Sequence, residues 1–190
     1  MKKKHIITIA GKPGSGKSTT SKSVAKQLNF THFSSGDFFR AAGKERGIDV
    51  FQANLVAEAE TDIDLAVDQK LRQLGEHEDN LVIDSRMAWH WMPYSFKVYL
   101  DLDLMIAAQR ILSSLDDARM EVEDIPDNEA TYAARLQDRL DSEAKRYKKL
   151  YDVNPYDPGN YDLVIDTSRH DLQSVQTMIA EKFNDWIIQP

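Results

Sequence analysis

The sequence of 190 residues contains no cysteine. Disulfides, thiolate zinc sites and catalytic thiols are therefore excluded, and a reducing compartment is favoured, with the cytoplasm as the expected location. Long apolar runs are missing too. None approaches the roughly 20 residues of a membrane-spanning helix, and the run near the lysine-rich start is too short for a signal peptide. We therefore expect no membrane partner.

Positive charge is scarce, with 24 lysines and arginines against 31 acidic residues and a formal net charge of -7. Proteins that bind nucleic acid draw much of their affinity from dense positive charge, so no nucleic-acid partner is expected. Any phosphate bound by this chain must be held by a few local groups.

Internal repeats and linkers rich in Gly and Ser are also absent, so residues 1–190 are expected to form a single domain and a monomer. Short apolar runs typical of interior strands span His5–Ala10, Thr31–Phe33, Leu81–Asp84, Lys97–Leu100 and Leu163–Asp166. Helical patterns between them span Lys17–Leu28, Leu104–Leu115, Glu129–Tyr151 and Leu172–Trp186. The alternation predicts an α/β fold: a five-stranded parallel sheet with helices on both faces.

Two segments interrupt this alternation. Residues 36–75 contain no strand-like run and are expected to form three short helices, with breaks near Gly47 and Thr61. Residues 113–128 are polar and acidic and contain Pro126. Both are expected to lie over the strand ends, where open α/β sheets bind ligands.

A complete GxxxxGK(S/T) motif, GKPGSGKS, occupies residues 11–18 between an apolar strand and a helix, which is the context that a phosphate-binding loop requires. Its glycines permit close approach of the backbone, so that successive amide groups can point at phosphate oxygens. The helix that follows adds its positive end. The residues expected to bind the triphosphate are Gly11, Pro13, Gly14, Ser15, Gly16, Lys17, Ser18 and Thr19.

Within this loop, Lys17 is expected to bridge the β and γ phosphates, and the Ser18 hydroxyl to bind Mg²⁺. The third expected strand continues into LVIDSRMAW, which puts Asp84 at its carboxyl end and Arg86 two residues later. Asp84 can face the metal, and Arg86 the transferring or accepting phosphate. Asp101 ends the next strand and is either a competing metal ligand or, as we favour, the N-cap of the following helix.

The segment SSGDFFR, Ser34 to Arg40, follows the second strand. Gly36 allows a turn, Asp37 can cap the next helix, and Arg40 is then carried toward the sheet, where a guanidinium can grip an acceptor phosphate through two hydrogen bonds. An ordinary capped helix with a surface arginine would explain the same pattern.

Three arginines, Arg135, Arg139 and Arg146, fall within about 40° of one another on an ideal helix. Placed after an acidic segment, they suit a closing lid that stabilises charge on a phosphoryl group in flight. The alternative is that they form exposed ion pairs with Glu143 and Asp138 on the same helix.

Two further residues have both a functional and an ordinary explanation. Arg110 can stack on the adenine of the donor or can be a helix-surface arginine. Asp68 can accept from a base amino group or can be an exposed helix charge. The five histidines show no metal-ligand spacing, and Trp89 and Trp91 are expected to pack a short helix onto the sheet.

The order of these motifs resembles that of the nucleoside monophosphate kinase family of P-loop kinases, and within it the archaeal-type cytidylate kinases most closely. The resemblance runs from about Ile6 to the last helix and includes SGDFFR, ERG, LVIDSRMAW, KVYLDLD, RYKKLY and YDLVIDTS. It implies Mg²⁺-dependent transfer from ATP to CMP or dCMP, with residues 36–75 covering the monophosphate and residues 113–128 forming part of a lid.

The resemblance also assigns residues on the acceptor side. Arg40 and Arg86 would hold the acceptor phosphate, and Ser35 and Gly36 would line the monophosphate pocket. Ser85 is a departure, because the family usually has a glycine before this arginine.

Two alternatives remain open at the level of sequence. A P-loop kinase of another small acceptor, such as AMP, shikimate or gluconate, fits the same loop. An alcohol acceptor would need a carboxylate such as Asp37 to accept its proton. A binding or regulatory module that hydrolyses ATP slowly is the other alternative, although the arginines at 40 and 86 make most sense if a second anion binds.

Overall fold

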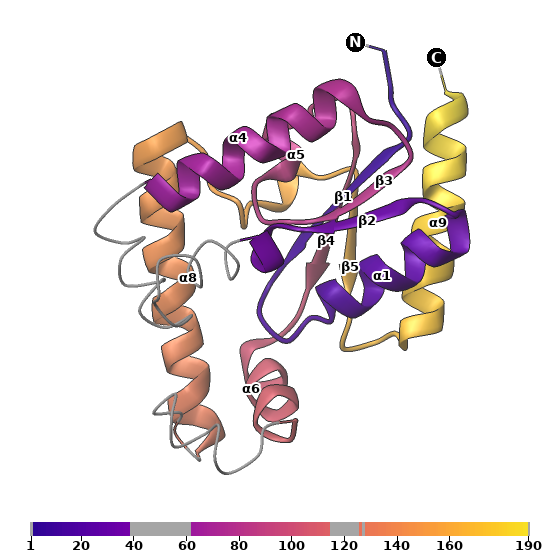
Figure 1. The fold of residues 1–190 in the computed structure, drawn as a ribbon. Helices are drawn as coiled ribbons and strands as arrows, with labels where there is room; N and C mark the ends of the chain where they lie inside the picture. Colours follow the sequence, from indigo (N-terminus) through magenta and orange to yellow (C-terminus); the bar gives the residue numbers. More distant parts are fainter. Residues whose placement is uncertain (1, 39–61, 115–125, 127, 190) are drawn as a thin grey trace.

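A single parallel sheet forms the centre of the computed structural model, which describes residues 2–38, 62–114, 126 and 128–189 (Figure 1). In the described part of the chain its strands are β1 (Ile6–Gly11), β2 (Thr31–Ser34), β3 (Leu81–Asp84), β4 (Phe96–Asp101) and β5 (Leu163–Asp166). They lie in the order β2-β3-β1-β4-β5, and every neighbouring pair is parallel. The predicted strands and fold class are confirmed.

The described helices are α1 (Lys17–Leu28), α4 (Asp62–His77), α5 (Ala88–Trp91), α6 (Leu104–Leu112), α8 (Glu129–Tyr151) and α9 (Leu172–Ile188), with a short 3₁₀ turn at Pro158–Asn160. The predicted bounds of α1 and α8 are confirmed, whereas α6 ends three residues earlier than predicted and α9 ends two residues later. Most of the two interrupting segments, at 39–61, 115–125 and 127, lies outside the described residues.

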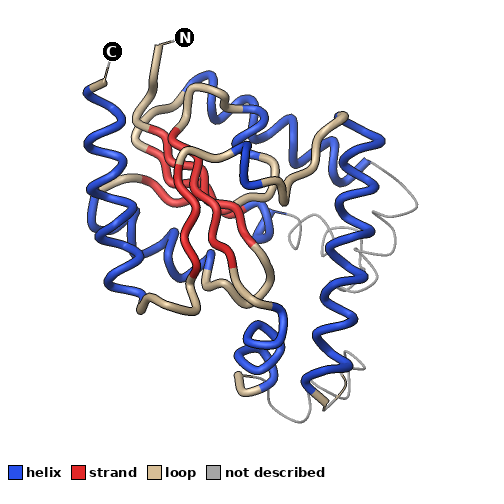
Figure 2. The backbone as a smooth tube through the Cα atoms, turned by 180° about the vertical axis from the view of Figure 1, so that it is seen from behind, coloured by secondary structure: helices blue, strands red, loops and turns tan. Residues whose placement is uncertain are grey.

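Alternate residues of the strands supply two cores, because successive side chains of a strand point to opposite faces. Ile7 and Ile9 of β1 pack with Val24 of α1 and Ile179 of α9 on one face. Ile6 lies on the other face, in the core that includes residues of α4 and α5. Figures 1 and 2 show α1 and α9 together on one side of the sheet and α4 on the opposite side.

Helix α4 continues past Gly75 to His77, whereas the sequence placed the end of this segment at Gly75. A Cβ atom at Gly75 would lie 2.5 Å from the Tyr94 hydroxyl and 2.8 Å from Met92 Cγ. A glycine here therefore lets α4 lie directly on the segment between α5 and β4.

Helices α6 and α8 lie beyond the carboxyl ends of the strands (Figure 1). They pack through small and branched side chains, with Ala107 and Ala108 of α6 against Ala133 and Leu136 of α8. Among the residues with described coordinates, no helix is both long and apolar enough to span a membrane.

Two predicted helix caps are wrong. Asp103, not Asp101, caps α6, where its carboxylate accepts from the amides of Met105 and Ile106. After β2 the helical turn already begins at residue 35, and the Ser34 hydroxyl accepts from the Asp37 amide at 3.3 Å. Ser34 is therefore the cap, and Gly36 and Asp37 lie inside the first turn. The sequence misplaced both caps because several Ser and Asp residues compete at each site and only the backbone decides among them.

Candidate active site

The loop between β1 and α1 has the backbone that its glycines were expected to provide. Gly14 and Gly16 have φ of 72° and 81°, in the left-handed region that side chains disfavour. At Gly11, with φ of 152°, a Cβ atom would lie 2.3 Å from the carbonyl oxygen of Leu100. The loop is therefore pressed against the end of β4.

The carbonyl oxygen of Lys12 accepts two side-chain hydrogen bonds inside this loop. Lys12 O accepts from the Ser15 hydroxyl at 2.7 Å and from Lys17 Nζ at 3.2 Å. The Lys12 side chain pairs with Asp101 at 2.7 Å, which engages the carboxylate that the sequence left as a possible metal ligand. Pro13 is half-buried in the loop, and Thr19 is exposed in the first turn of α1. These contacts hold the backbone of the loop in the shape of a phosphate cradle.

The ammonium of Lys17 lies among several charges. Burial first, and the nearby Arg86 second, lower its pKa to about 8, while Asp84 and Glu143 act in the opposite direction and Arg139 lowers it further. Because burial disfavours the charged form of Lys17, an anion that binds next to it would stabilise that form strongly.

The side chains of Ser18 and Asp84 contact each other at the carboxyl ends of the strands. The Ser18 hydroxyl donates to Asp84 Oδ2 at 2.5 Å, and the Asp84 carboxylate is buried. A hydroxyl oxygen next to a carboxylate is a donor set that suits Mg²⁺, which is usually held by one or two protein oxygens, phosphate oxygens and water. These residues therefore fit the metal that the sequence assigned to them. No larger cluster of three His, Cys, Asp or Glu side chains occurs among the residues that the structure describes.

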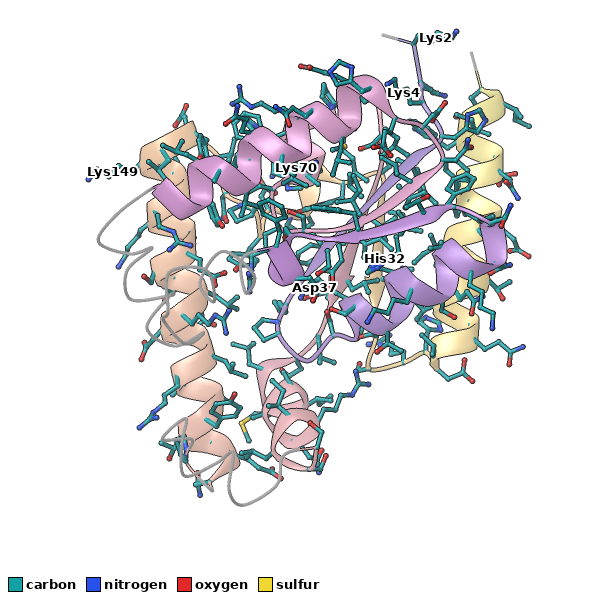
Figure 3. All side chains as sticks on the ribbon, in the orientation of Figure 1. Lys2, Lys4, His32, Asp37, Lys70 and Lys149 are labelled. Atoms are coloured by element: carbon teal, nitrogen blue, oxygen red, sulfur yellow. The ribbon has the colours of Figure 1, made fainter. Side chains whose placement is uncertain are left out.

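The chain on the β2 side reaches the same edge. The Ser35 hydroxyl donates to the carbonyl oxygen of Asp84 at 3.2 Å. Figure 3 shows Asp37 in the turn just beyond β2, where it is exposed. Arg40 lies outside the described residues. Ser85 is buried, and its hydroxyl accepts from the Met87 amide at 3.2 Å, so this departure from the family pattern serves a local turn.

Arg86 lies just after β3 and forms an ion pair with Glu143 of α8. Its Nε lies 2.9 Å from Glu143 Oε2, and Tyr156 donates its hydroxyl to the same carboxylate oxygen. Burial opposes the charge on Arg86, but Glu143 and Tyr156 outweigh it and raise the pKa of the guanidinium. Burial likewise favours a neutral Glu143, but Arg86 and Arg139 overcome it and hold the pKa of Glu143 at about 2.

The three arginines of α8 differ in their surroundings. Arg135 is exposed. Arg139 donates through Nε to Glu143 Oε1 at 3.0 Å, so the ion pair considered from the sequence forms, but its acidic partner is buried rather than exposed. Arg146 is half-buried, with its guanidinium carbon 5.3 Å from the centre of the Tyr147 ring.

Arg110, in α6, contacts the segment that follows β5. Its Nη2 donates to the carbonyl oxygen of Thr167 at 2.8 Å, and the Thr167 hydroxyl in turn donates to the carbonyl oxygen of Asp101 at 3.1 Å. The guanidinium is thereby fixed beside the segment that follows β5.

Asp68, in α4, is buried. The explanation that it is an exposed helix charge is therefore wrong. One carboxylate oxygen accepts from the Trp91 indole at 2.9 Å and the other from the Tyr151 hydroxyl at 2.5 Å. Arg72 stacks on Trp91, with its guanidinium carbon 3.7 Å from the ring centre. Asp68 therefore joins α4, α5 and the end of α8.

The family model described as "Cytidylate kinase-like family" matches residues 6–169 of this chain. The chain belongs to the cytidylate kinase-like family.

Curated relatives of this family member support the assignment. It is 39% identical over 173 residues to the cytidylate kinase of Haloarcula marismortui, covering 90% of this chain and 84% of that protein. It is 34% identical over 183 residues to the cytidylate kinase of Methanocella arvoryzae, covering 95% and 97% of the two chains.

Solved structures share its fold. The shikimate kinase of Bacteroides thetaiotaomicron has a TM-score of 0.64 at 14% identity and covers 94% of this chain and 98% of its own. The shikimate kinase of Acinetobacter baumannii, solved in complex with shikimate, has a TM-score of 0.60 at 15% identity and covers 97% and 95%. At these identities the likeness shows the P-loop kinase fold of this cytidylate kinase-like chain and nothing of its acceptor.

Three residues of the candidate site were not singled out for it by the sequence. Glu143 was considered only as a surface partner of Arg139, and Tyr156 and Thr167 were not considered. The signal for Glu143 was present, because it follows Leu136 and Leu140 at helical spacing and so falls on the apolar face that packs inward. An acid on a buried face needs cationic partners.

Proposed function

We propose that this chain transfers the γ-phosphoryl group of ATP, with Mg²⁺, to a cytidine monophosphate, CMP or dCMP. The single observation that supports it most is the convergence at one sheet edge of the phosphate cradle, the Ser18 and Asp84 oxygen pair and the Arg86 guanidinium. The first two suit a nucleoside triphosphate and its metal, and the third suits a second anion. The relatives that bear the name cytidylate kinase favour a cytidine nucleotide as that anion.

In the proposed mechanism the main-chain amides of residues 11–18 hold the triphosphate, and Lys17 neutralises charge on the β and γ phosphates. Mg²⁺, held by Ser18 and Asp84, would supply further neutralisation of the same oxygens. Arg139 and Arg86 would stabilise charge on the phosphoryl group in flight. The protein does little covalent chemistry, since its work is to align two anions that repel each other.

No general base is required by this proposal. A phosphate monoester is largely a dianion at neutral pH, so it is already nucleophilic. An alcohol acceptor would instead have to lose a proton, for which Asp37 is the exposed carboxylate next to the turn after β2. The proposal therefore predicts that Asp37 contributes to binding and not to proton transfer.

The remaining assignments belong to the same proposal. Ser35, Gly36, Arg40 and Arg86 would contact the acceptor, with Asp68 behind them, and Arg110 would stack on the adenine of ATP. Arg135 and Arg146 would join Arg139 as the lid closes. Residues 36–75 would cover the monophosphate and residues 113–128 would form the lid segment of a single, monomeric, cytoplasmic domain.

A coupled ADP-release assay tests the proposal. The full chain would be incubated with ATP and Mg²⁺ and with CMP, dCMP, UMP, AMP, shikimate or gluconate in turn. CMP and dCMP should give the highest kcat/KM, and the Lys17→Ala variant should abolish turnover. Activity on AMP alone would remove the cytidylate assignment but keep the reaction class. An ATPase rate that no acceptor changes would indicate a regulatory module instead.

A further inference from the structure

The carboxylate of Glu143 joins two arginines that come from different elements. Its Oε2 lies 2.9 Å from Arg86 Nε, in the segment after β3, and its Oε1 lies 3.0 Å from Arg139 Nε, one turn earlier in α8. Tyr156, beyond the end of α8, adds a hydroxyl donor. The Glu143 side chain is only 11% exposed, so both oxygens are used inside the protein.

The contacts with Glu143 leave the terminal nitrogens of both guanidiniums available for an anion. Arg139 donates its single Nε–H to Glu143, whereas Arg86 is held as an ion pair, with its Nε near the carboxylate but without a hydrogen bond to it. Each guanidinium carries four more N–H groups on its two terminal nitrogens. Those terminal nitrogens can bind a phosphoryl group while Nε stays on the carboxylate. Burial also makes rotation of the Glu143 side chain costly, so the two guanidiniums share a fixed reference point.

The charges around Lys17 show where this arrangement lies. The pKa of Lys17 responds to Arg86, Asp84, Glu143 and Arg139, from β3, the segment after it and α8. The carboxylate therefore lies beside the phosphate cradle, where it offsets the mutual repulsion of three cations before any substrate binds.

We propose that Glu143 is a positioning residue for phosphoryl transfer, whose buried carboxylate fixes Arg86 and Arg139 so that both can face the transferred phosphoryl group. This inference rests on the proposed function. Glu143 acts through the arginines and does not itself touch substrate.

An ordinary ion pair on a helix surface does not account for these contacts. Such a pair would be exposed and would join residues of one helix, as Arg139 and Glu143 do by sequence spacing. Glu143 is instead buried, and it also holds Arg86, which belongs to another element 57 positions away in the chain.

The first test compares steady-state kinetics of the wild type and the Glu143→Gln variant with ATP and CMP. The amide keeps the shape but has only one oxygen acceptor, so the charge and at least one arginine contact are lost. We expect kcat to fall roughly 10- to 100-fold, the range for a misplaced reacting geometry or a lost supporting partner. KM for ATP should change far less, because the phosphate cradle is intact. The exposed Asp138→Asn on the same helix is the matched control, and its kcat should stay within about twofold of wild type.

A double-mutant cycle separates positioning from a purely structural role. In an Arg86→Ala background, Glu143→Gln should cost less than in the wild type, because one of the two side chains to be positioned is gone and only Arg139 remains. An equal loss in both backgrounds would overturn the inference, as would a wild-type kcat for Glu143→Gln.

Tyr156→Phe gives an independent reading if Glu143→Gln does not fold. It removes only one hydroxyl from the carboxylate, so kcat should drop several-fold with KM for ATP preserved, and an unchanged kcat would count against the inference. Failure of the proposed function looks different: the wild type itself would then transfer no phosphoryl group to any monophosphate.

Discussion

The lowered pKa of Lys17 predicts an unusual pH dependence of ATP binding. Burial and the neighbouring Arg86 lower this pKa from 10.5 to about 8 in the free protein. At a pKa of 8, about nine-tenths of the side chain is charged at pH 7 and about one-tenth at pH 9. Because the charged form binds the triphosphate, affinity is present below pH 8 and is lost as pH rises through this value. We expect a fall of about tenfold between pH 7 and pH 9.

Isothermal titration calorimetry with ATP and Mg²⁺, without acceptor and at constant ionic strength, measures this dependence. Starting at pH 7 keeps the phosphates of ATP ionised, since phosphate monoesters titrate near pH 6. Lys17→Met should bind weakly at every pH and lack the fall, which makes it the control for other effects of pH. Arg86→Gln removes the second cause of the lowered pKa and should move the fall to higher pH. Constant affinity up to pH 9.5 in the wild type would refute the reasoning.

The other predictions concern the loop, the metal and the acceptor. Gly11→Ala should lower the free energy of unfolding in urea by roughly 1–3 kcal/mol or more, because its Cβ would lie 2.3 Å from the Leu100 carbonyl oxygen. The control is Gly159→Ala, whose Cβ would meet only the Asp157 side chain and which should change this free energy by about 0.5 kcal/mol or less. Ser18→Ala should raise the Mg²⁺ concentration for half-maximal rate roughly 10- to 100-fold, whereas Ser23→Ala, on the same helix but bonded to Gln176, should not; equal Mg²⁺ requirements would argue against Ser18 as a ligand. Asp37→Asn should leave kcat with CMP within about twofold, since a loss of about 100-fold or more would mark a general base and favour an alcohol acceptor.

The fold was predictable because its signals are local. An interior strand of a parallel sheet is buried on both faces, so it reads as an apolar run, and all five strands were located from such runs. The phosphate cradle was predictable for a similar reason: its backbone angles require glycines at fixed spacing, and Gly14 and Gly16 adopt them. Only the family resemblance, now confirmed, indicated which acceptor to expect.

The contacts between elements were not predictable in the same way. Helical spacing put Arg139 beside Glu143, but nothing local indicated that Arg86 would reach the same carboxylate from the segment after β3. Asp68 likewise looked like one exposed charge of α4, and its burial depends on Trp91 and Tyr151, which come from two other helices. Such partners are set by how helices pack on the sheet, which a pattern within one segment does not contain.

The two ends of the chain lie close together and far from the phosphate cradle. Lys3 donates to the carbonyl oxygens of Trp186 and Gln189 at 2.5 and 2.9 Å, so the first strand is approached from beside the last helix. Figures 1 and 2 show both ends next to each other at the edge where the strands begin, opposite the edge where the phosphate cradle opens. A purification tag, a fluorophore or a surface linker attached at either end would therefore lie away from the phosphate cradle, and dyes on both ends would report on unfolding.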